Sequence, residues 1–446
     1  MLSKEDNELL CRVGPQTPMG DLMRQYWIPA LLSEELGEPD GPPLRLRLLG
    51  ENLVAFRTSS GRPGVVVNSC PHRGASLFFG RNEEEGLRCV YHGWKFDVTG
   101  ACVDMPSEPS ESNFRAKVRV RAYPCEERNG IVWTYMGPRS APPPLPEIEG
   151  NLSADGVVRR RVIECNYMQA LEGDIDTIHA GFLHYGHVNV EDLTPESCYY
   201  YTLRQKTATF VTAENEVGAS YGAFRPAEAG TDYWRVAHFL FPFYTMNPSD
   251  LLGQRIAIFA WVPIDDEYCM SWAIQVLPAS RDINERGIGG LVRGIQTLRG
   301  ARGEAPKIAG LLEPSSGWNG RSRPVANIRN DFLIDRQEQG DWTTYSGVPS
   351  DAQDPMAQES MGPIYNRTGE HLATTDAMII RTRRRLIAAA KQLRDTGAIP
   401  PGVDEPALYR MRSGGAILPS GVDGLDVLKD VIRARGQMVE VTTPAT

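Results

Sequence analysis

The sequence predicts a chain of two bodies, in which a compact antiparallel β domain precedes a larger body that combines a second sheet with helices. Short alternating or apolar runs, separated by turn residues, fill residues 40–137 and are typical of strands. A proline-rich stretch at residues 138–150 interrupts this pattern and has the composition of a linker. Beyond it strand-like runs return, and an amphipathic helix is predicted over residues 376–396.

We therefore divide the chain into three parts. Residues 1–35 are expected to form an N-terminal helical segment that packs on the body, and residues 36–140 the β domain. Residues 141–446 are expected to form the larger domain. Within it, residues 280–329 are rich in Gly and Arg and show little periodicity, so we expect a surface excursion or a lid there.

Composition limits the class of protein. A chain of 446 residues exceeds one ordinary core, and 41% hydrophobic residues suffice for globular cores. The net charge of −9 argues against nucleic acid or an anionic membrane as the main partner. No stretch reaches the roughly 18 continuous apolar residues of a membrane helix, and the acidic N-terminus lacks a signal-peptide profile. The eight scattered cysteines need no disulfides in so long a chain, so we expect a cytoplasmic protein.

Local signals assign the elements of the first two parts. Apolar residues at helical spacing near the N-terminus predict one short helix, and Thr17 followed by Pro18 predicts the start of a second. Residues 44–48 read Leu-Arg-Leu-Arg-Leu, the strict alternation of a half-buried strand. Further strands of the β domain are predicted at residues 54–56, 64–68, 117–121 and 131–135.

The larger domain is expected to open with a strand at residues 157–163. Further strands of its sheet are predicted at residues 199–211, 233–243, 255–262 and 271–277. The helix over residues 376–396 has an apolar face and a charged side, and Gly397 and Pro400 end it.

Two loops of the β domain carry the first chemical constellation. One contains Cys70 and His72, and the other contains Cys89 and His92. Two Cys with two His are also a structural zinc set, but a zinc finger usually takes its His pair from one helix and its Cys pair from one turn. Here each loop supplies a mixed pair, which suits a [2Fe–2S] cluster with two Cys on one iron and two His on the other.

The second constellation lies in residues 166–187, which hold three of the seven histidines. Asp176 and His179 are three apart and would share a helical face. His179 and His184 are five apart, about 140° round an ideal helix, so a straight helix could not aim both at one ion. We therefore expect the helix to end or distort at Gly181. Two His with one carboxylate and open positions are typical of non-haem ferrous iron.

These residues resemble a known family. Cys-Pro-His-Arg-Gly from Cys70 and Cys-Val-Tyr-His-Gly-Trp from Cys89 are similar to the cluster loops of Rieske non-haem iron oxygenases. Asp176-x-x-His179-x-x-x-x-His184 resembles the mononuclear iron motif of the same family, in the same order along the chain. Other stretches look like its phthalate-dioxygenase-type branch.

The resemblance implies roles for single residues. The two mixed loops would hold the cluster, and the two histidines would hold iron together with Asp354. Glu359 and Asp351 are the alternatives for this third ligand. Asp176 would be a bridging acid that hydrogen-bonds His92 of a neighbouring subunit.

The resemblance also implies the fold class and the reaction. The class would be α+β, an antiparallel β Rieske domain followed by a helix-grip-like catalytic domain in which helices cover an antiparallel sheet. The chain would be a terminal oxygenase that takes electrons from a reductase or ferredoxin and uses O2 to hydroxylate a small aromatic substrate. We expect ring dihydroxylation of an aromatic carboxylate by a homotrimer or a dimer of trimers. Oxidative O-demethylation or N-dealkylation is the alternative.

Two other classes of protein stay open at this point, a Rieske electron carrier without oxygenase activity and a zinc-stabilised binding module. A carboxylate substrate would need a buried arginine, because a guanidinium can hold a carboxylate by two hydrogen bonds. The candidates in predicted strands are Arg204, Arg225, Arg235 and Arg255.

Overall fold

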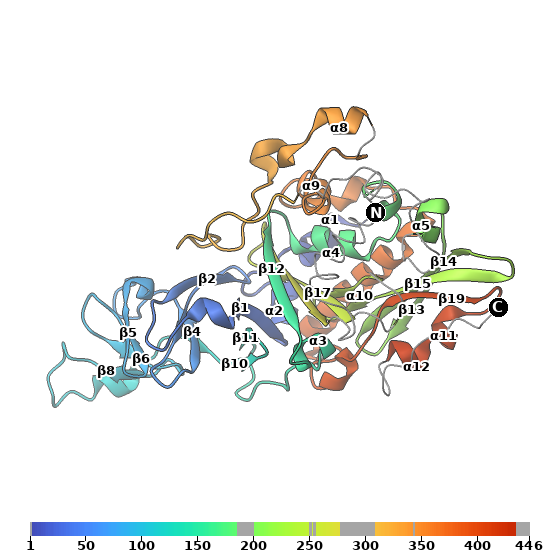
Figure 1. The fold of residues 1–446 in the computed structure, drawn as a ribbon. Coiled ribbons are helices and arrows are strands. Elements are labelled where there is room, and N and C mark those ends of the chain that lie inside the picture. Colours follow the sequence, from blue (N-terminus) through green and yellow to red (C-terminus); the bar gives the residue numbers. More distant parts are fainter. Residues whose placement is uncertain are drawn as a thin grey trace.

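The computed structural model describes residues 2–184, 200–248, 252, 256–276, 308–341 and 344–433. Figure 1 shows an elongated molecule, with the β domain at one end and the larger domain at the other. Among the residues described, no helix is long and apolar enough to cross a membrane.

Three small antiparallel sheets make up the β domain. One has the order β2-β3-β4-β9, the second β5-β6-β7-β8, and the third β1-β11-β10. Their bounds are Trp27–Leu32 for β1, Leu44–Leu48 for β2, Glu51–Arg57 for β3, Pro63–Val67 for β4, Arg81–Glu83 for β5, Gly86–Arg88 for β6, Lys95–Phe96 for β7, Cys102–Asp104 for β8, Ala122–Tyr123 for β9, Cys125–Arg128 for β10 and Ile131–Tyr135 for β11. Although β1 precedes residue 36, it pairs with β11.

The strand predicted at residues 117–121 is wrong. Phe114–Lys117 form a 3-10 helix, and ladder pairing begins only at β9. The alternation of this stretch reflects burial instead, because Val120 is buried in a small core whereas Arg119 between the two valines is exposed. The chain there is extended and makes a single bridge, between Arg119 and Ala101.

The sheet of the larger domain has eight described strands, all paired antiparallel. Their order is β12-β18-β17-β16-β15-β14-β13, and β19 pairs with β15. Their bounds are Val157–Ile163 for β12, Thr209–Asn215 for β13, Gly218–Pro226 for β14, Thr231–Leu240 for β15, Tyr244–Met246 for β16, Ile256–Pro263 for β17, Cys269–Val276 for β18 and Gly414–Pro419 for β19.

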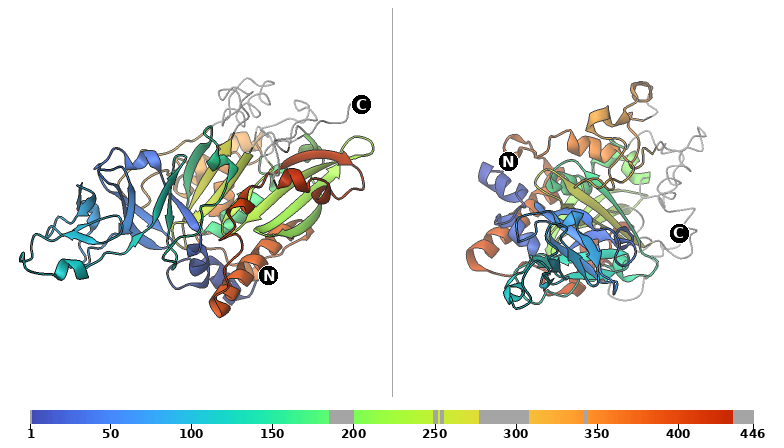
Figure 2. Two further views of the ribbon diagram at one scale, coloured as in Figure 1. Left: turned by 90° about the horizontal axis from the view of Figure 1, so that it is seen from below. Right: turned by 90° about the vertical axis from the view of Figure 1, so that its left-hand side faces the viewer.

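Helices cover one face of this sheet (Figures 1 and 2). Helix α4 contacts β15 to β17, α10 contacts β13 and β14, and the two helices contact each other. The α-helices of eight residues or more are Lys4–Cys11 for α1, Tyr167–Ile175 for α4 and Ala377–Thr396 for α10. The shorter ones are Pro18–Arg24 for α2, Glu149–Leu152 for α3, Tyr200–Arg204 for α5, Arg336–Gly340 for α8, Gln353–Glu359 for α9, Gly424–Val427 for α11 and Lys429–Ile432 for α12.

Short 3-10 helices complete the fold at Ser33–Leu36, Leu77–Phe79, Phe114–Lys117, His179–Gly181, Ile328–Leu333, Arg367–Gly369, Thr374–Asp376 and Pro406–Tyr409. The predicted caps are confirmed. The hydroxyl of Thr17 accepts from the backbone N–H of Gly20 at the start of α2. Gly397 ends α10 with a φ of 72°, the left-handed conformation that glycine adopts easily.

The strand predicted at residues 199–211 is only half right. Residues 200–204 form α5, and β13 begins at Thr209. Three consecutive side chains of α5 are buried, Tyr201, Thr202 and Leu203, and the ring of Tyr201 stacks on Tyr233 at 5.2 Å. Packing of one helical turn against the sheet therefore outweighs the strand propensity of these residues.

A separate small core supports the cluster loops at the tip of the β domain. It contains Cys70 and Cys89 together with large apolar side chains such as Phe56, Leu77 and Phe96. The main core, by contrast, runs from the N-terminal helices through the junction of the two domains into the sheet of the larger domain. The loops thus pack on a small core of their own.

Candidate iron–sulfur and mononuclear metal sites

The two loops that hold the predicted cluster residues have the same backbone turn. The N–H of Gly74 donates to the carbonyl of Cys70 at 2.9 Å, and the N–H of Gly93 donates to the carbonyl of Cys89 at 3.0 Å. Both glycines have a φ of 76°, which favours glycine. At Gly93 a side chain would also collide with the ring of Pro106, 2.7 Å from the position of its Cβ. The two turns therefore match in backbone, although the histidine follows the cysteine by two residues in the first loop and by three in the second.

The side chains of these loops divide into an inner and an outer pair. Cys70 and Cys89 are 3% and 2% exposed, whereas His72 is exposed and His92 half-buried. The two imidazole centroids are 4.4 Å apart, and Trp94 stacks on His72 at 4.4 Å. Burial, reinforced by the thiol of Cys89, raises the pKa of Cys70 to about 11. Two inner thiols with two outer imidazoles fit a [2Fe–2S] cluster, whose iron would replace the thiol protons.

A second group of ligands converges in the larger domain. His179 and His184 lie in and just after the 3-10 helix that follows α4, and Asp354 lies in the first turn of α9. One ligand atom from each residue lies within 4.8 Å of the others. Oδ1 of Asp354 is 3.4 Å from Nε2 of both histidines. This donor set fits a ferrous ion that keeps positions open for other ligands.

Charge at this site favours a cation. Burial alone would lower the pKa of His179, but the carboxylates of Asp176 and Asp354 outweigh it and raise that pKa to about 10. Burial would likewise raise the pKa of Asp354, yet the imidazoles of His184 and His179 hold it well below its usual value. In the metal-free chain His179 therefore binds a proton at neutral pH, and this proton competes with a metal ion.

The break that turns both histidines to one point lies earlier than predicted. Helix α4 ends at Ile175, and Asp176 caps it with an extended ψ of 116°. Oδ1 of Asp176 accepts from the N–H of Ile178 at 2.7 Å, which forms a tight turn before His179. Gly181 has no left-handed φ, and a Cβ there would meet nothing closer than 3.5 Å. The expectation that Gly181 supplies the break is therefore wrong, and the side chain of Asp176 ends the helix.

The alternative carboxylates are engaged elsewhere. Oε1 of Glu359 accepts from the N–H of Glu164 at 3.0 Å, and burial raises the pKa of Glu359 to about 7. The carboxylate of Asp351 accepts from the N–H groups of Ala309 and Gly310. Of the three acids weighed, only Asp354 meets the imidazoles. His187, the third histidine of the stretch, lies outside the described residues, as do residues 280–307 of the predicted excursion.

Each histidine of the site has an oxygen behind it. Nδ1 of His179 lies 3.7 Å from Oδ2 of Asp176, and Nδ1 of His184 lies 2.7 Å from Oε1 of Gln353. Sequence reasoning missed Gln353, although it directly precedes Asp354. Glutamine has no charge and no fixed role in a motif, so the sequence carries no signal that would single it out.

A buried arginine pair lies on strands β14 and β15, on the face that also carries Tyr221. In the register Ala223 opposes Arg235, and Arg225 opposes Tyr233, so the two guanidinium groups are diagonal neighbours. Arg225 is 1% exposed and donates from Nε to the carbonyl of Gln205, whereas its Nη1 and Nη2 have no hydrogen-bond partner in the described part of the chain. Burial and then Arg235 lower the pKa of Arg225 to about 10.

Tyr221 lies on the same face of β14, close enough to Asp176 and Asp174 for their charges to act on it. Burial raises the pKa of this phenol, the charge of Arg235 and the hydroxyl of Thr177 lower it, and the charges of Asp176 and Asp174 raise it further. The hydroxyls of Tyr221 and Thr177 are both buried without a hydrogen-bond partner among the residues described. Unsatisfied buried polar groups are rare in proteins, which makes the hydroxyl of Tyr221 a candidate for contact with a bound polar group.

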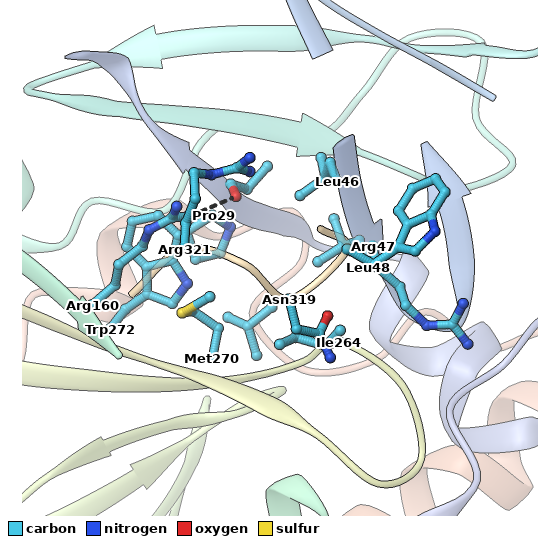
Figure 3. A pocket seen from close by; sticks show the side chains of 13 residues that line it. Pro29, Leu46, Arg47, Leu48, Arg160, Ile264, Met270, Trp272, Asn319 and Arg321 are labelled. Atoms are coloured by element: carbon cyan, nitrogen blue, oxygen red, sulfur yellow. Dashed lines mark hydrogen bonds between the residues drawn. The ribbon is translucent and has the colours of Figure 1, made fainter. Parts of the chain in front are cut away.

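Of the other candidate arginines, Arg204 is exposed and donates to the hydroxyl of Tyr200 at 2.6 Å, and Arg255 lies outside the described residues. A cavity of about 30 Å³ lies elsewhere, where β2 meets β12 and β18, and it contains none of the candidate ligands. Figure 3 shows Arg160, Trp272 and Arg321 at its wall. It could hold a water molecule but is about tenfold too small for an aromatic substrate.

Comparison with known proteins agrees with this arrangement. The family described as the Rieske [2Fe-2S] domain matches residues 26–124, and the family described as LigXa C-terminal domain like matches residues 316–437. The chain is 44% identical over 433 residues to the 3-chlorobenzoate-3,4-dioxygenase oxygenase subunit of Comamonas testosteroni, covering 95% of this chain and 97% of that protein. It is 36% identical over 447 residues to the phthalate 4,5-dioxygenase oxygenase subunit of Pseudomonas putida, covering 96% and 94%.

A solved structure shares the fold. The oxygenase in the reduced complex between oxygenase and ferredoxin in carbazole 1,9a-dioxygenase aligns with a TM-score of 0.52 at 19% identity, covering 89% of this chain and 99% of that chain. This likeness confirms the predicted α+β class. The full-length relatives are oxygenase subunits, which leaves the electron-carrier and zinc-module alternatives without support. The chain therefore belongs to the Rieske non-haem iron aromatic ring-hydroxylating oxygenases, as the α subunit of a terminal oxygenase that carries a [2Fe–2S] cluster and a mononuclear iron.

Proposed function

We propose that this oxygenase dihydroxylates the ring of an aromatic carboxylate and that Arg225 and Arg235 recognise the carboxylate. The observation that carries the proposal is the guanidinium of Arg225, buried with two nitrogens unpartnered beside a second cation. A buried charge without a partner is costly, and a carboxylate supplies the matching charge and a two-oxygen acceptor. The relatives named for chlorobenzoate and phthalate support a substrate with one aromatic ring and a carboxylate.

The geometry gives the substrate a direction. Tyr221 and Arg225 are four positions apart on β14, about 13 Å at the rise of a strand. Tyr221 marks the end of this span that is next to Asp176 and Thr177. If the carboxylate of the substrate is held at Arg225, its aromatic ring lies between Arg225 and Tyr221. The ring would thus face the metal ligands with its far edge.

The remaining residues would have distinct roles. Cys70, His72, Cys89 and His92 would hold the cluster, and His179, His184 and Asp354 would hold the iron. When bound, the cluster supplies single electrons and the iron binds and activates O2. Asp176 keeps His179 in place and carries a side chain that is 31% exposed, so it can also contact another subunit.

We also propose a homotrimer or a dimer of trimers. Figures 1 and 2 show the sheet β5–β8, beside the cluster loops, at the end of the molecule far from α4. A short contact between His92 and Asp176 is therefore expected between neighbouring copies and not within one chain. Electrons come from a separate donor protein, which we propose to be a reductase or a ferredoxin. Sedimentation of the purified holoprotein tests the oligomer.

Product analysis tests the reaction. The reconstituted oxygenase is supplied with a reductase and a panel of benzoates, phthalates, methoxybenzoates and their uncharged methyl esters. Ring dihydroxylation incorporates both atoms of one labelled O2 into the ring, whereas O-demethylation releases formaldehyde. Formaldehyde as the main product, with no ring diol from any acid, would overturn the assignment.

Arginine variants test the recognition of the acid. Replacing Arg225 by Met removes charged hydrogen bonds worth about 2–3 kcal/mol, so the KM for the acid should rise about 30- to 150-fold. The methyl ester should be unaffected. Arg204→Met is the matched control, because Arg204 is the exposed last residue of α5. An equal change for acid and ester would show that Arg225 does not bind the carboxylate.

A further inference from the structure

Gln353 lies directly behind one of the candidate iron ligands. It is the first residue of α9 and is 1% exposed. Its Oε1 is 2.7 Å from Nδ1 of His184, on the side of the ring opposite to Asp354. The residue therefore touches the histidine from the backbone segment that also supplies the carboxylate ligand.

The orientation of the Gln353 amide is fixed by its other contacts. Nε2 donates to the carbonyl of Val348 at 3.3 Å and to the hydroxyl of Ser346 at 3.0 Å. A carbonyl can only accept, so the NH2 group must face Val348 and the oxygen must face His184. An amide assigned in this way cannot be turned over without losing a buried hydrogen bond.

The fixed amide determines which nitrogen of His184 carries the proton. Because Oε1 accepts, a neutral imidazole must donate from Nδ1, and its lone pair is then on Nε2. This is the nitrogen that lies 3.4 Å from Asp354. We infer that Gln353 is a positioning residue, which holds His184 in the tautomer and ring orientation that binds the mononuclear iron. The inference rests on the proposed role of His184 as a ligand.

The two histidines are supported in different ways. His179 has the carboxylate of Asp176 behind it, whereas His184 has a neutral amide. A second carboxylate at position 353 would place another negative charge next to Asp354 and would face the carbonyl of Val348 with an acceptor. Glutamine supplies the oxygen without either conflict.

The same contacts tie the site to a neighbouring loop. Tyr345 directly precedes Ser346, and its ring meets the ring of Phe182 edge-on, with centroids 6.1 Å apart. Phe182 lies between the two histidines in the sequence. The loop therefore holds the histidine segment at Phe182 through an aromatic contact and at His184 through Gln353.

The test compares three variants of the holoprotein by the dissociation constant of Fe(II) and its rate of loss to a chelator. Gln353→Met keeps a side chain of similar volume but removes the oxygen that accepts from Nδ1 of His184. Loss of a hydrogen bond to a metal-binding histidine weakens metal binding about 10- to 100-fold. Gln353→Glu keeps an oxygen toward Nδ1, so its loss should be smaller. Gln358→Met is the control, because this buried glutamine of the same helix has an Oε1 without a partner in the described part of the chain.

The outcomes separate this inference from the ligand assignment. The inference is supported if Gln353→Met binds Fe(II) more weakly than Gln353→Glu does while the two variants have equal cluster absorption. This holds whatever their melting temperatures. Iron bound as tightly in Gln353→Met as in the natural protein, while His184→Ala loses it, overturns the positioning role alone. If His184→Ala keeps its iron, the ligand assignment itself fails. If Gln353→Met does not fold, Gln353→Ala replaces it as the variant without an acceptor, and a wild-type rate of iron release from Gln353→Ala would overturn the inference.

Discussion

Oδ1 of Asp354 lies 3.4 Å from Nε2 of His184, although most of a sheet is built from the chain between them. Helix α4 and helix α9 pack against each other and bring the two segments together. This contact identifies Asp354, among the acids of its zone, as the carboxylate to test first.

Asp354→Ala should lose the mononuclear iron and all turnover while keeping the absorption of the cluster. Iron content should fall from about three to about two per chain, the two of the cluster. Glu359→Ala should keep about three, because its carboxylate binds the backbone of Glu164. If Glu359→Ala loses iron and Asp354→Ala keeps it, the assignment of Asp354 as the third ligand is wrong.

His92→Ala or Cys70→Ala should abolish the visible absorption of the cluster and leave the mononuclear site able to bind iron. The reason is that the cluster loops stand on their own small core at the far end of the molecule from α4 (Figure 1). Absorption spectra and metal analysis of the same samples measure both sites. Loss of iron from both sites in a folded protein would contradict this separation.

Asp176→Asn should keep both metal centres and the oligomer, since the oxygen of Asn can still accept from the N–H of Ile178 and keep the turn before His179. It removes the charge proposed to hold an imidazole of the neighbouring cluster loop. Reoxidation of the reduced cluster by O2 with substrate present should slow sharply, and stopped-flow absorption measures it.

Mixed oligomers check that this route runs between subunits. Asp176→Asn and His72→Ala subunits are each expected to be inactive alone. Together they can form an interface that pairs an intact cluster loop with an intact Asp176, so some activity should return. Rapid cluster reoxidation in pure Asp176→Asn enzyme would refute the bridge.

Metal binding should depend on pH through His179. Its pKa of about 10 in the metal-free chain lies above the ordinary value of 6.5, so a bound proton competes with the metal. Between pH 6.5 and 10 the affinity for a divalent ion should rise up to about tenfold per pH unit, with release of one proton. Titration of the mononuclear site with Co(II) at several pH values measures this slope, and a flat profile would contradict the raised pKa.

The stability of the metal-free protein should fall as the pH rises, whereas its affinity for a metal ion rises. A group whose pKa is raised on folding contributes stability that is fully present below the unfolded pKa. For His179 this contribution is present below about pH 6.5 and is lost as the pH rises through about 10. Thermal unfolding of the metal-free chain at several pH values, with His179→Gln as the control, measures the difference.

The sequence predicted the elements that local chemistry controls. The caps of α2 and α10 and most strands follow from residue type and periodicity, and the α+β class is confirmed. The failures arise where packing decides. Apolar and charged residues alternate over residues 117–121 because Val120 is buried and Arg119 is exposed. Residues 200–204 are helical because three neighbouring side chains pack on the sheet.

The candidate site shows the same limit. The spacing of His179 and His184 required a break, but Gly181 was the obvious residue and Asp176 is the one that ends α4. Gln353 could not be found at all, because its role depends on the position of Val348 and not on its own chemistry. The ligands assigned to both centres stay predictions until the variants above are measured.

The positions of the two ligand sets in the chain differ in a way that affects how the protein matures. All four cluster residues lie between residues 70 and 92, on one small core, and can meet while the rest is still being synthesised. The iron ligands come from residues 179–184 and from Asp354, so they meet only after nearly the whole catalytic sheet has left the ribosome. Iron binding then closes a long loop of chain and resists its reopening. Cluster insertion can therefore precede iron loading, and a chain truncated before α9 should acquire colour without ever acquiring the third iron.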